Sequence, residues 1–122
     1  MDAAAGAGGE EPAQLSRGQR LQRLFSLGDH SLEGSIRRLN HLNARGPAAV
    51  LADNPLLTRA DLEYYKAEPV QRGIADAMGR IETAIAAGDD RALHDATRTV
   101  VLQETRLAIV ERLLAHLDSL GR

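Results

Sequence analysis

The chain contains no cysteine, and this absence excludes several kinds of chemistry at the outset. Without thiols it has no disulfide, no thiolate zinc site and no cysteine nucleophile. A chain without cysteine is also compatible with a reducing compartment. We therefore take a cytoplasmic location as the expectation.

Aromatic residues are nearly absent as well, at 2% of the chain: Phe25, Tyr64 and Tyr65. A core must then be built from Leu, Ile, Val and Ala. Surfaces that bind RNA or single-stranded DNA need aromatic side chains on which bases stack, so this class loses support. The net charge of -2 gives no overall attraction to phosphate backbones either. Nucleic acid is therefore not the expected partner.

Long apolar runs are missing, since no segment approaches the roughly 18 apolar residues that span a bilayer. We expect no membrane partner. Residues 1–14 are rich in Ala and Gly and carry neither the basic nor the leucine-rich region of a secretory signal, so we expect a flexible tail there. Lys66 is the only lysine, and together with abundant alanine this suggests a bacterial genome of high GC content.

The clearest positive feature is a helical hairpin in the last third of the chain. Gly88 is expected to end the first helix in a left-handed conformation, and Asp89 to cap the second. The pattern predicts a short helix over about 70–87 and a long one over about 90–120, which has no Gly or Pro before Gly121. Apolar residues at three- and four-residue steps mark one face of the first helix; they are Val70, Ile74, Ala77, Met78, Ile81, Ala84 and Ile85.

Shorter helices are predicted before this hairpin. Ser16 with Gln19 resembles a capping box that opens a first helix, with Leu21, Leu24, Phe25 and Leu27 inward and Gly28 as its end. A second helix starts near Asp29 or Ser31, buries Leu32, Ile36, Leu39 and Leu42 along one stripe, and ends at Gly46-Pro47. Thr58 with Asp61 opens a third, short helix that stops before Pro69. The predicted fold is all-α: a small helical bundle in which the C-terminal hairpin packs against two N-terminal helices and one short helix, with residues 15–122 as a single domain.

The last helix has a wider apolar face than one partner helix can cover. One row of apolar residues follows the helix at heptad-like spacing and is interrupted by Gln103. A second strip lies beside this row and is formed by Leu102, Ile109, Leu113 and Leu120. The helix is also about 45 Å long, against about 28 Å for the helix before it. The excess apolar surface needs cover from the N-terminal helices or from a second copy of the chain.

These features predict a protein–protein interaction module without enzymatic activity: an adaptor, accessory subunit or assembly protein. We expect self-association as a dimer, or binding of another protein, through the long C-terminal helix. The predicted interface consists of the second strip, with rim contacts from the last helix and the short helix: Leu102, Arg106, Ile109, Leu113, Leu120 and Tyr64.

Catalytic, cofactor and metal residues are not predicted. His30 and Glu33 are three residues apart, and His41 lies two further turns on, but a helical metal centre needs a second such pair on a facing helix. Asp89-Asp90 is explained as an N-cap followed by a favourable charge in the first turn.

An alternative function is DNA-associated transcriptional regulation. Residues 20–44 have the outline of a degenerate helix-turn-helix with Gly28 in the turn, and the C-terminal hairpin would dimerise. In this interpretation Arg37 and Arg38 project from the second helix towards DNA, although the expected buried aliphatic position is occupied by Gly34. A ligand-binding bundle with a pocket beside the Thr58–Ala67 helix is a further alternative.

Overall fold

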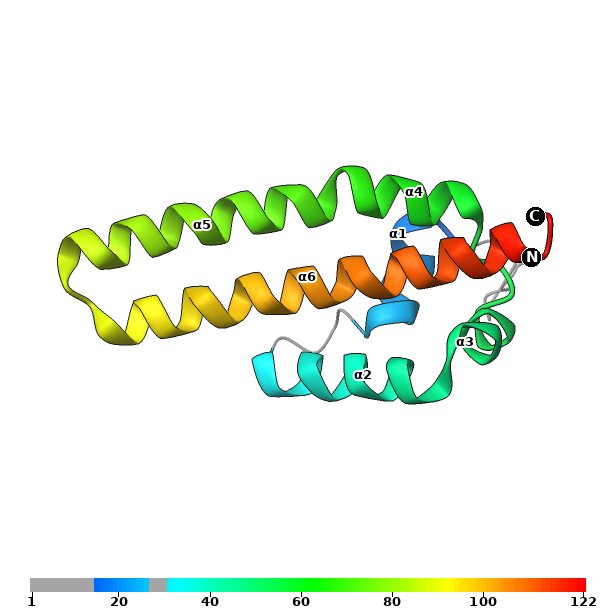
Figure 1. Ribbon diagram of the computed structural model, residues 1–122, viewed down its shortest axis with the longest axis horizontal. Coiled ribbons are helices and arrows are strands. Elements are labelled where there is room, and N and C mark those ends of the chain that lie inside the picture. Colours follow the sequence, from blue (N-terminus) through cyan, green and yellow to red (C-terminus); the bar gives the residue numbers. More distant parts are fainter. Residues whose placement is uncertain (1–14, 27–30) are drawn as a thin grey trace, which may run out of the picture.

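The computed structural model describes residues 15–26 and 31–122. Within these ranges the chain forms six α-helices and no strand, which confirms the predicted all-α fold. Two long antiparallel helices, α5 (Pro69–Ala87) and α6 (Asp90–Ser119), form a hairpin that runs the length of the molecule. The shorter helices pack against it near the end where α6 terminates (Figure 1).

The turn between α5 and α6 confirms the signals read from the sequence. Gly88 ends α5 with φ 66°, a left-handed conformation that glycine adopts without a steric penalty. Asp89 then caps α6 by accepting a hydrogen bond from the Ala92 N–H at 3.0 Å. The hairpin is therefore specified locally by two consecutive residues.

The first helix begins at the predicted cap, and the second begins at one of the two predicted positions. The Ser16 hydroxyl accepts from Gln19 N–H and the Gln19 side chain accepts from Ser16 N–H, which completes the capping box of α1 (Arg17–Phe25). Ser31 caps α2 (Leu32–Arg45) by accepting from Gly34 N–H. The α1 helix ends at Ser26, in a left-handed conformation with φ 52°. The predicted inward Leu27 and stop at Gly28 lie outside the described residues.

Two shorter helices complete the chain. The segment after Gly46 forms α3 (Pro47–Asp53), and the Thr58–Asp61 capping box opens α4 (Arg59–Ala67). Glu68 ends α4 and precedes the first residue of α5, with backbone angles still in the right-handed helical region. Figure 1 accordingly shows α4 leading almost directly into α5.

The hydrophobic core lies over the C-terminal half of α6. Helices α2, α3 and α4 contact α6 there, and α1 lies against α2 and α4. The opposite half of the hairpin, near Gly88, extends past α1 and α2 in Figure 1. Its buried contacts are supplied by alanines. The core proper is made largely of Leu, as expected from the scarcity of aromatics; its fully enclosed members include Leu24, Phe25, Leu62, Val70, Val110 and Leu113.

Candidate interaction surface

Most of the predicted interface strip lies inside the folded chain. Leu102, Ile109 and Leu113 are buried and belong to the hydrophobic core. The reason is the packing of the N-terminal helices: Ile109 and Leu113, for example, meet Leu42 and Val50 at the α2–α3 junction. The excess apolar width of α6 is thus covered within the chain over its C-terminal half.

Arg106, predicted as a rim contact, is buried too. Its guanidinium carbon lies 5.9 Å from the centre of the Phe25 ring, a distance at which the cation still interacts with the ring face. Its Nε has no hydrogen-bond partner among the described residues. Burial raises the pKa of the neighbouring Tyr65 hydroxyl, and the positive charge of Arg106 partly offsets that effect.

The last two predicted interface residues are at least partly accessible. Tyr64 is half-buried on α4, with the Arg17 guanidinium carbon 4.8 Å from its ring centre. Leu120 is exposed at the end of α6. Because four of the six predicted residues are buried, the set does not form one exposed surface.

A different apolar surface is left open near the closed end of the hairpin. There α5 and α6 touch along a line of small residues, with Ala77, Ala84 and Ala96 buried. Gly73 belongs to the same line, because a Cβ added there would lie 2.8 Å from the Gln103 side chain. Small residues bring the two helices close together and leave their larger neighbours on the flanks.

One flank of this contact line is a shallow cleft of about 520 Å³. Its lining combines alanines with polar and charged side chains, and includes Arg80, Thr83 and Ala87 of α5 with Ala92, Asp95 and Thr99 of α6. Residues on the other flank therefore share the opposite face. That face carries large aliphatic side chains, which we call the apolar strip: Ile74, Met78, Ile81 and Ile85 of α5, and Leu93, Val100 and Leu107 of α6.

The apolar strip is accessible along its length. Met78 is 50% exposed and Ile85 is 63% exposed, while the remaining members are half-buried. Ile74 and Leu107 pack against the core, so the strip starts at the bundle and runs to the tip. The sequence pattern places Met78 and Ile85 on the inward face of α5, and for these two residues the structure differs. The alanines at 77, 84 and 96 are the signal for the true contact line, since they mark where two helices approach most closely.

Charged side chains at the other end of the molecule serve the fold. Arg20 and Arg17 of α1 both donate to the buried carboxylate of Asp61, and Arg20 also donates to the Leu15 carbonyl at 2.6 Å. Arg38 donates to the carbonyls of Leu24 and Arg23 and so joins α2 to α1. Arg38 is one of the two arginines predicted to project towards DNA, and the other, Arg37, is exposed on α2. Arg38 is therefore engaged within the fold, and the alternative of DNA binding stays a prediction.

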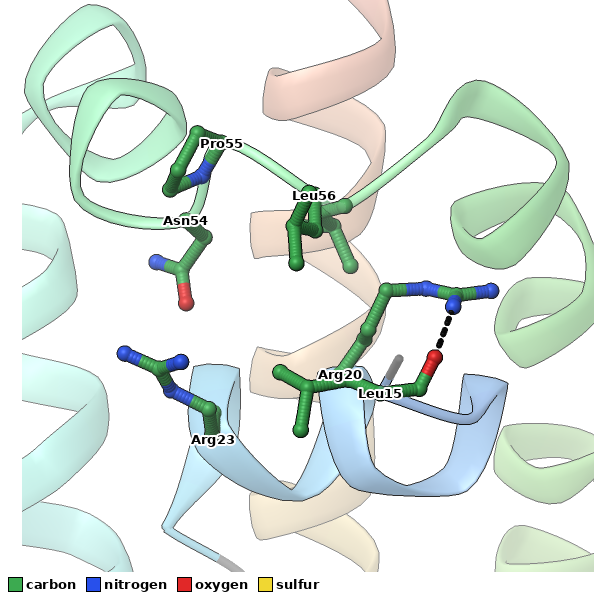
Figure 2. Close-up of a pocket in the computed structure, with 7 residues that line it drawn as sticks. Leu15, Arg20, Arg23, Asn54, Pro55 and Leu56 are labelled. Atoms are coloured by element: carbon green, nitrogen blue, oxygen red, sulfur yellow. Dashed lines mark hydrogen bonds between the residues drawn. The ribbon is translucent and has the colours of Figure 1, made fainter. Parts of the chain in front are cut away.

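A small hollow lies between α1 and the α3–α4 connection. Figure 2 shows Arg23 and Asn54 facing each other at one side of it, with Leu15, Arg20, Pro55 and Leu56 around the rest. Its volume is about 130 Å³, below the roughly 300 Å³ at which ligand pockets begin. The guanidinium of Arg20 already forms an ion pair with Asp61. We assign no ligand to this hollow.

Among residues 15–26 and 31–122, no three His, Asp or Glu side chains cluster as metal ligands do. His30, one of the histidines considered for a metal pair, lies outside the described residues. None of the helices in the described part of the chain has the length and apolar character that a membrane crossing requires. Comparison of the chain with protein-family models, with curated proteins and with solved structures gives no match.

Proposed function

We propose that this chain is a protein–protein interaction module without an active site of its own, and that the apolar strip is its binding surface. The observation that carries the proposal is the exposure of Met78 and Ile85 on a hairpin end that no other described helix covers. Burial of a large aliphatic side chain contributes about 1.5–3 kcal/mol, so a chain that leaves a row of them in water retains a strong drive to bind.

The arrangement of the hairpin supports this role. A helix pair has two broad faces, and the bundle covers one of them over the C-terminal half of α6. The apolar strip occupies the other face and extends through α5 and α6 together. A partner seated there contacts the long C-terminal helix, as expected from the sequence, but through Leu93, Val100 and Leu107 and not through the buried second strip.

The test replaces the exposed members of the strip and compares them with an equally exposed residue elsewhere. Met78→Gln/Ile85→Gln removes the apolar contact, and glutamine has a high helix propensity, so α5 should stay intact. Val101→Gln is the control matched in exposure, since Val101 is 57% exposed on α6 and is not a member of the apolar strip. A photoreactive residue introduced at position 78 or at position 101 in the native host identifies partners, and binding of each purified partner is then measured.

We expect crosslinks from position 78 to exceed those from position 101. The double variant should weaken binding of the purified partner at least tenfold, and Val101→Gln should leave it unchanged. Equal crosslinking at both positions would contradict the proposal. Light scattering across a range of concentrations tests the predicted homodimer separately, because a dimer abolished by Met78→Gln/Ile85→Gln would identify the partner as a second copy.

A further inference from the structure

The margins of the apolar strip are acidic. Glu82 borders it on α5, and Glu104 and Glu111 border it on α6. Glu111 lies 3.7 Å from Lys66, where the strip reaches α4. Glu82 and Glu104 make no ion pair within the described residues. In the part of the chain that the structure describes, one glutamate on each margin is thus left without an ion pair.

The arginines of the hairpin are placed elsewhere. Arg98 pairs with Glu33 of α2, and Arg112 donates to Asn43 of the same helix. Arg80 lines the cleft on the opposite flank. The opposite flank therefore combines Arg80 with the aspartates Asp89 and Asp95, whereas the margins of the apolar strip carry glutamates and none of these three arginines.

We propose that the occupant of the apolar strip is an amphipathic helix of another protein, apolar along one side and bearing lysine or arginine at its margins. This inference rests on the proposed function and specifies the chemical class of the partner. A helix laid against the strip buries its apolar side between α5 and α6, which is a common mode of recognition for helical peptides. Its basic margins then meet Glu82 and Glu104, and this complementarity determines specificity and accelerates association.

The dimensions of the strip fit such a helix. Ile74 and Ile85 are eleven positions apart on α5, so the apolar row on this helix is about 17 Å long at 1.5 Å per residue. A partner helix of about 12–14 residues covers that length. Three to four turns provide enough apolar positions to meet both α5 and α6.

A second copy of the chain is a poorer match for the same surface. A twofold axis places a surface against itself, so the acidic margins of one copy would face the acidic margins of the other. Like charges across an interface disfavour association. An anionic lipid surface would be repelled for the same reason. The margins therefore favour a basic partner over these two occupants.

The experiment uses two synthetic peptides of about 14 residues. Both carry the same leucine face and the same hydrocarbon staple on the solvent side; one has lysine at its margins and the other has glutamate. Affinity for the full chain is measured by fluorescence anisotropy at low and at high salt. We expect the lysine peptide to bind at least tenfold more tightly than the glutamate peptide, with the difference shrinking as salt screens the charges.

Charge reversal in the protein provides the decisive comparison. Glu82→Lys/Glu104→Lys should invert the preference, so that the glutamate peptide binds better. Asp76→Lys is the control, because Asp76 is exposed on α5 away from the strip and its reversal should leave the preference unchanged.

The possible failures are distinguishable. If both peptides bind equally well and Met78→Gln/Ile85→Gln abolishes their binding, the inference that the partner is basic would be overturned. The strip would still be a binding surface. A dimer that depends on Met78 and Ile85 would also overturn it, in favour of a second copy. Failure of a monomeric chain to bind either peptide would overturn both this inference and the proposed function.

Discussion

Arg20 of α1 donates two hydrogen bonds to Asp61 of α4, from Nε to one carboxylate oxygen at 2.7 Å and from Nη2 to the other at 2.9 Å. Asp61 is 0% exposed, and it also accepts from the Thr58 N–H as the third residue of the α4 capping box. One carboxylate therefore begins a helix and attaches α1 to it. The sequence separation between the two partners makes this a tertiary contact in a chain whose contacts are mostly local.

Replacing Asp61 should destabilise the fold far more than replacing a surface aspartate of the same kind. Asp61→Asn leaves the guanidinium of Arg20 beside a neutral group in a partly buried site, and we expect a loss of about 2–3 kcal/mol in the free energy of unfolding. Asp53→Asn breaks a comparable pair with Arg45, but both of those side chains are about half exposed, so its effect should be much smaller. Urea denaturation of the two variants measures the difference. Equal losses would show that burial of Asp61 is unimportant.

The Asp61 carboxylate also predicts how stability depends on pH. Hydrogen bonds from Arg20, and then from Thr58 N–H and Arg17, outweigh the cost of burial and hold the pKa of Asp61 well below its usual value of about 3.9. The folded state therefore binds fewer protons than the unfolded state, so this contribution is present above about pH 5 and is lost progressively as the pH falls below about 4. Urea midpoints between pH 7 and pH 3 should fall less steeply in Asp61→Asn than in the original chain. An unchanged slope would contradict the assignment.

Local signals in the sequence accounted for the elements, and tertiary packing decided the surface. Ser16, Thr58, Gly88 and Asp89 act through hydrogen bonds and backbone angles within a few residues, so their roles are readable without a structure. The wide apolar face of α6 likewise predicts that something must cover it, and Leu102, Ile109 and Leu113 are indeed covered within the chain.

What the sequence left open was which side of each long helix would be covered. The burial of Ile109 depends on where α1–α4 pack, because either a second copy or the same chain satisfies the apolar pattern. Met78 and Ile85 lie next to Ala77 and Ala84 on α5, so periodicity alone places all of them on one face. The distinction arises because Ala77 and Ala84 admit α6 at close range, which turns the larger side chains to the flank.

Two glycines of α5 allow the close contact with α6 to be measured. Gly79 has open space where a Cβ would be, so Gly79→Ala should stabilise the protein by about 0.5–1 kcal/mol through helix propensity alone. In Gly73→Ala the new methyl meets Gln103 at 2.8 Å, so the gain should be smaller or reversed. In the Gly73→Ala/Gln103→Ala variant the shortened side chain at position 103 leaves room for the new methyl. The stabilisation from Gly73→Ala should therefore return when this variant is compared with Gln103→Ala. Thermal unfolding of the four variants measures these gains, and equal gains from both glycine replacements would show that Gln103 moves aside at no cost.

Arg106 should be dispensable for stability if its volume is retained. Its Nε lacks a hydrogen-bond partner among the described residues, and no carboxylate pairs with it there. Replacement of a buried charged residue by an apolar one of similar volume is often neutral or stabilising, so Arg106→Met should match or exceed the original chain in thermal unfolding. Arg106→Ala leaves space beside Phe25 and should cost about 2 kcal/mol. Destabilisation by Arg106→Met as large as that by Arg106→Ala would indicate that the charge itself stabilises the fold.

The two ends of the hairpin should differ in local stability. The C-terminal half of α6 buries Val110, Leu113 and Leu117 under the other helices, whereas the half near Gly88 is held mainly by small alanine contacts. Backbone hydrogen bonds open most readily where few apolar contacts break, so amides of residues 80–97 should exchange with deuterium faster than those of residues 106–117.

Binding supplies the control for this prediction. If the apolar strip takes a helical partner, the lysine-margined peptide should slow exchange over residues 80–97 and leave residues 106–117 nearly unchanged, because the latter already open only with the whole fold. Uniform protection along α6 in the free chain would contradict the prediction, since it would mean that the hairpin end is as stable as the core without any partner. Slow exchange confined to the bound state would instead show that the open end of the hairpin is stabilised by the contact it makes.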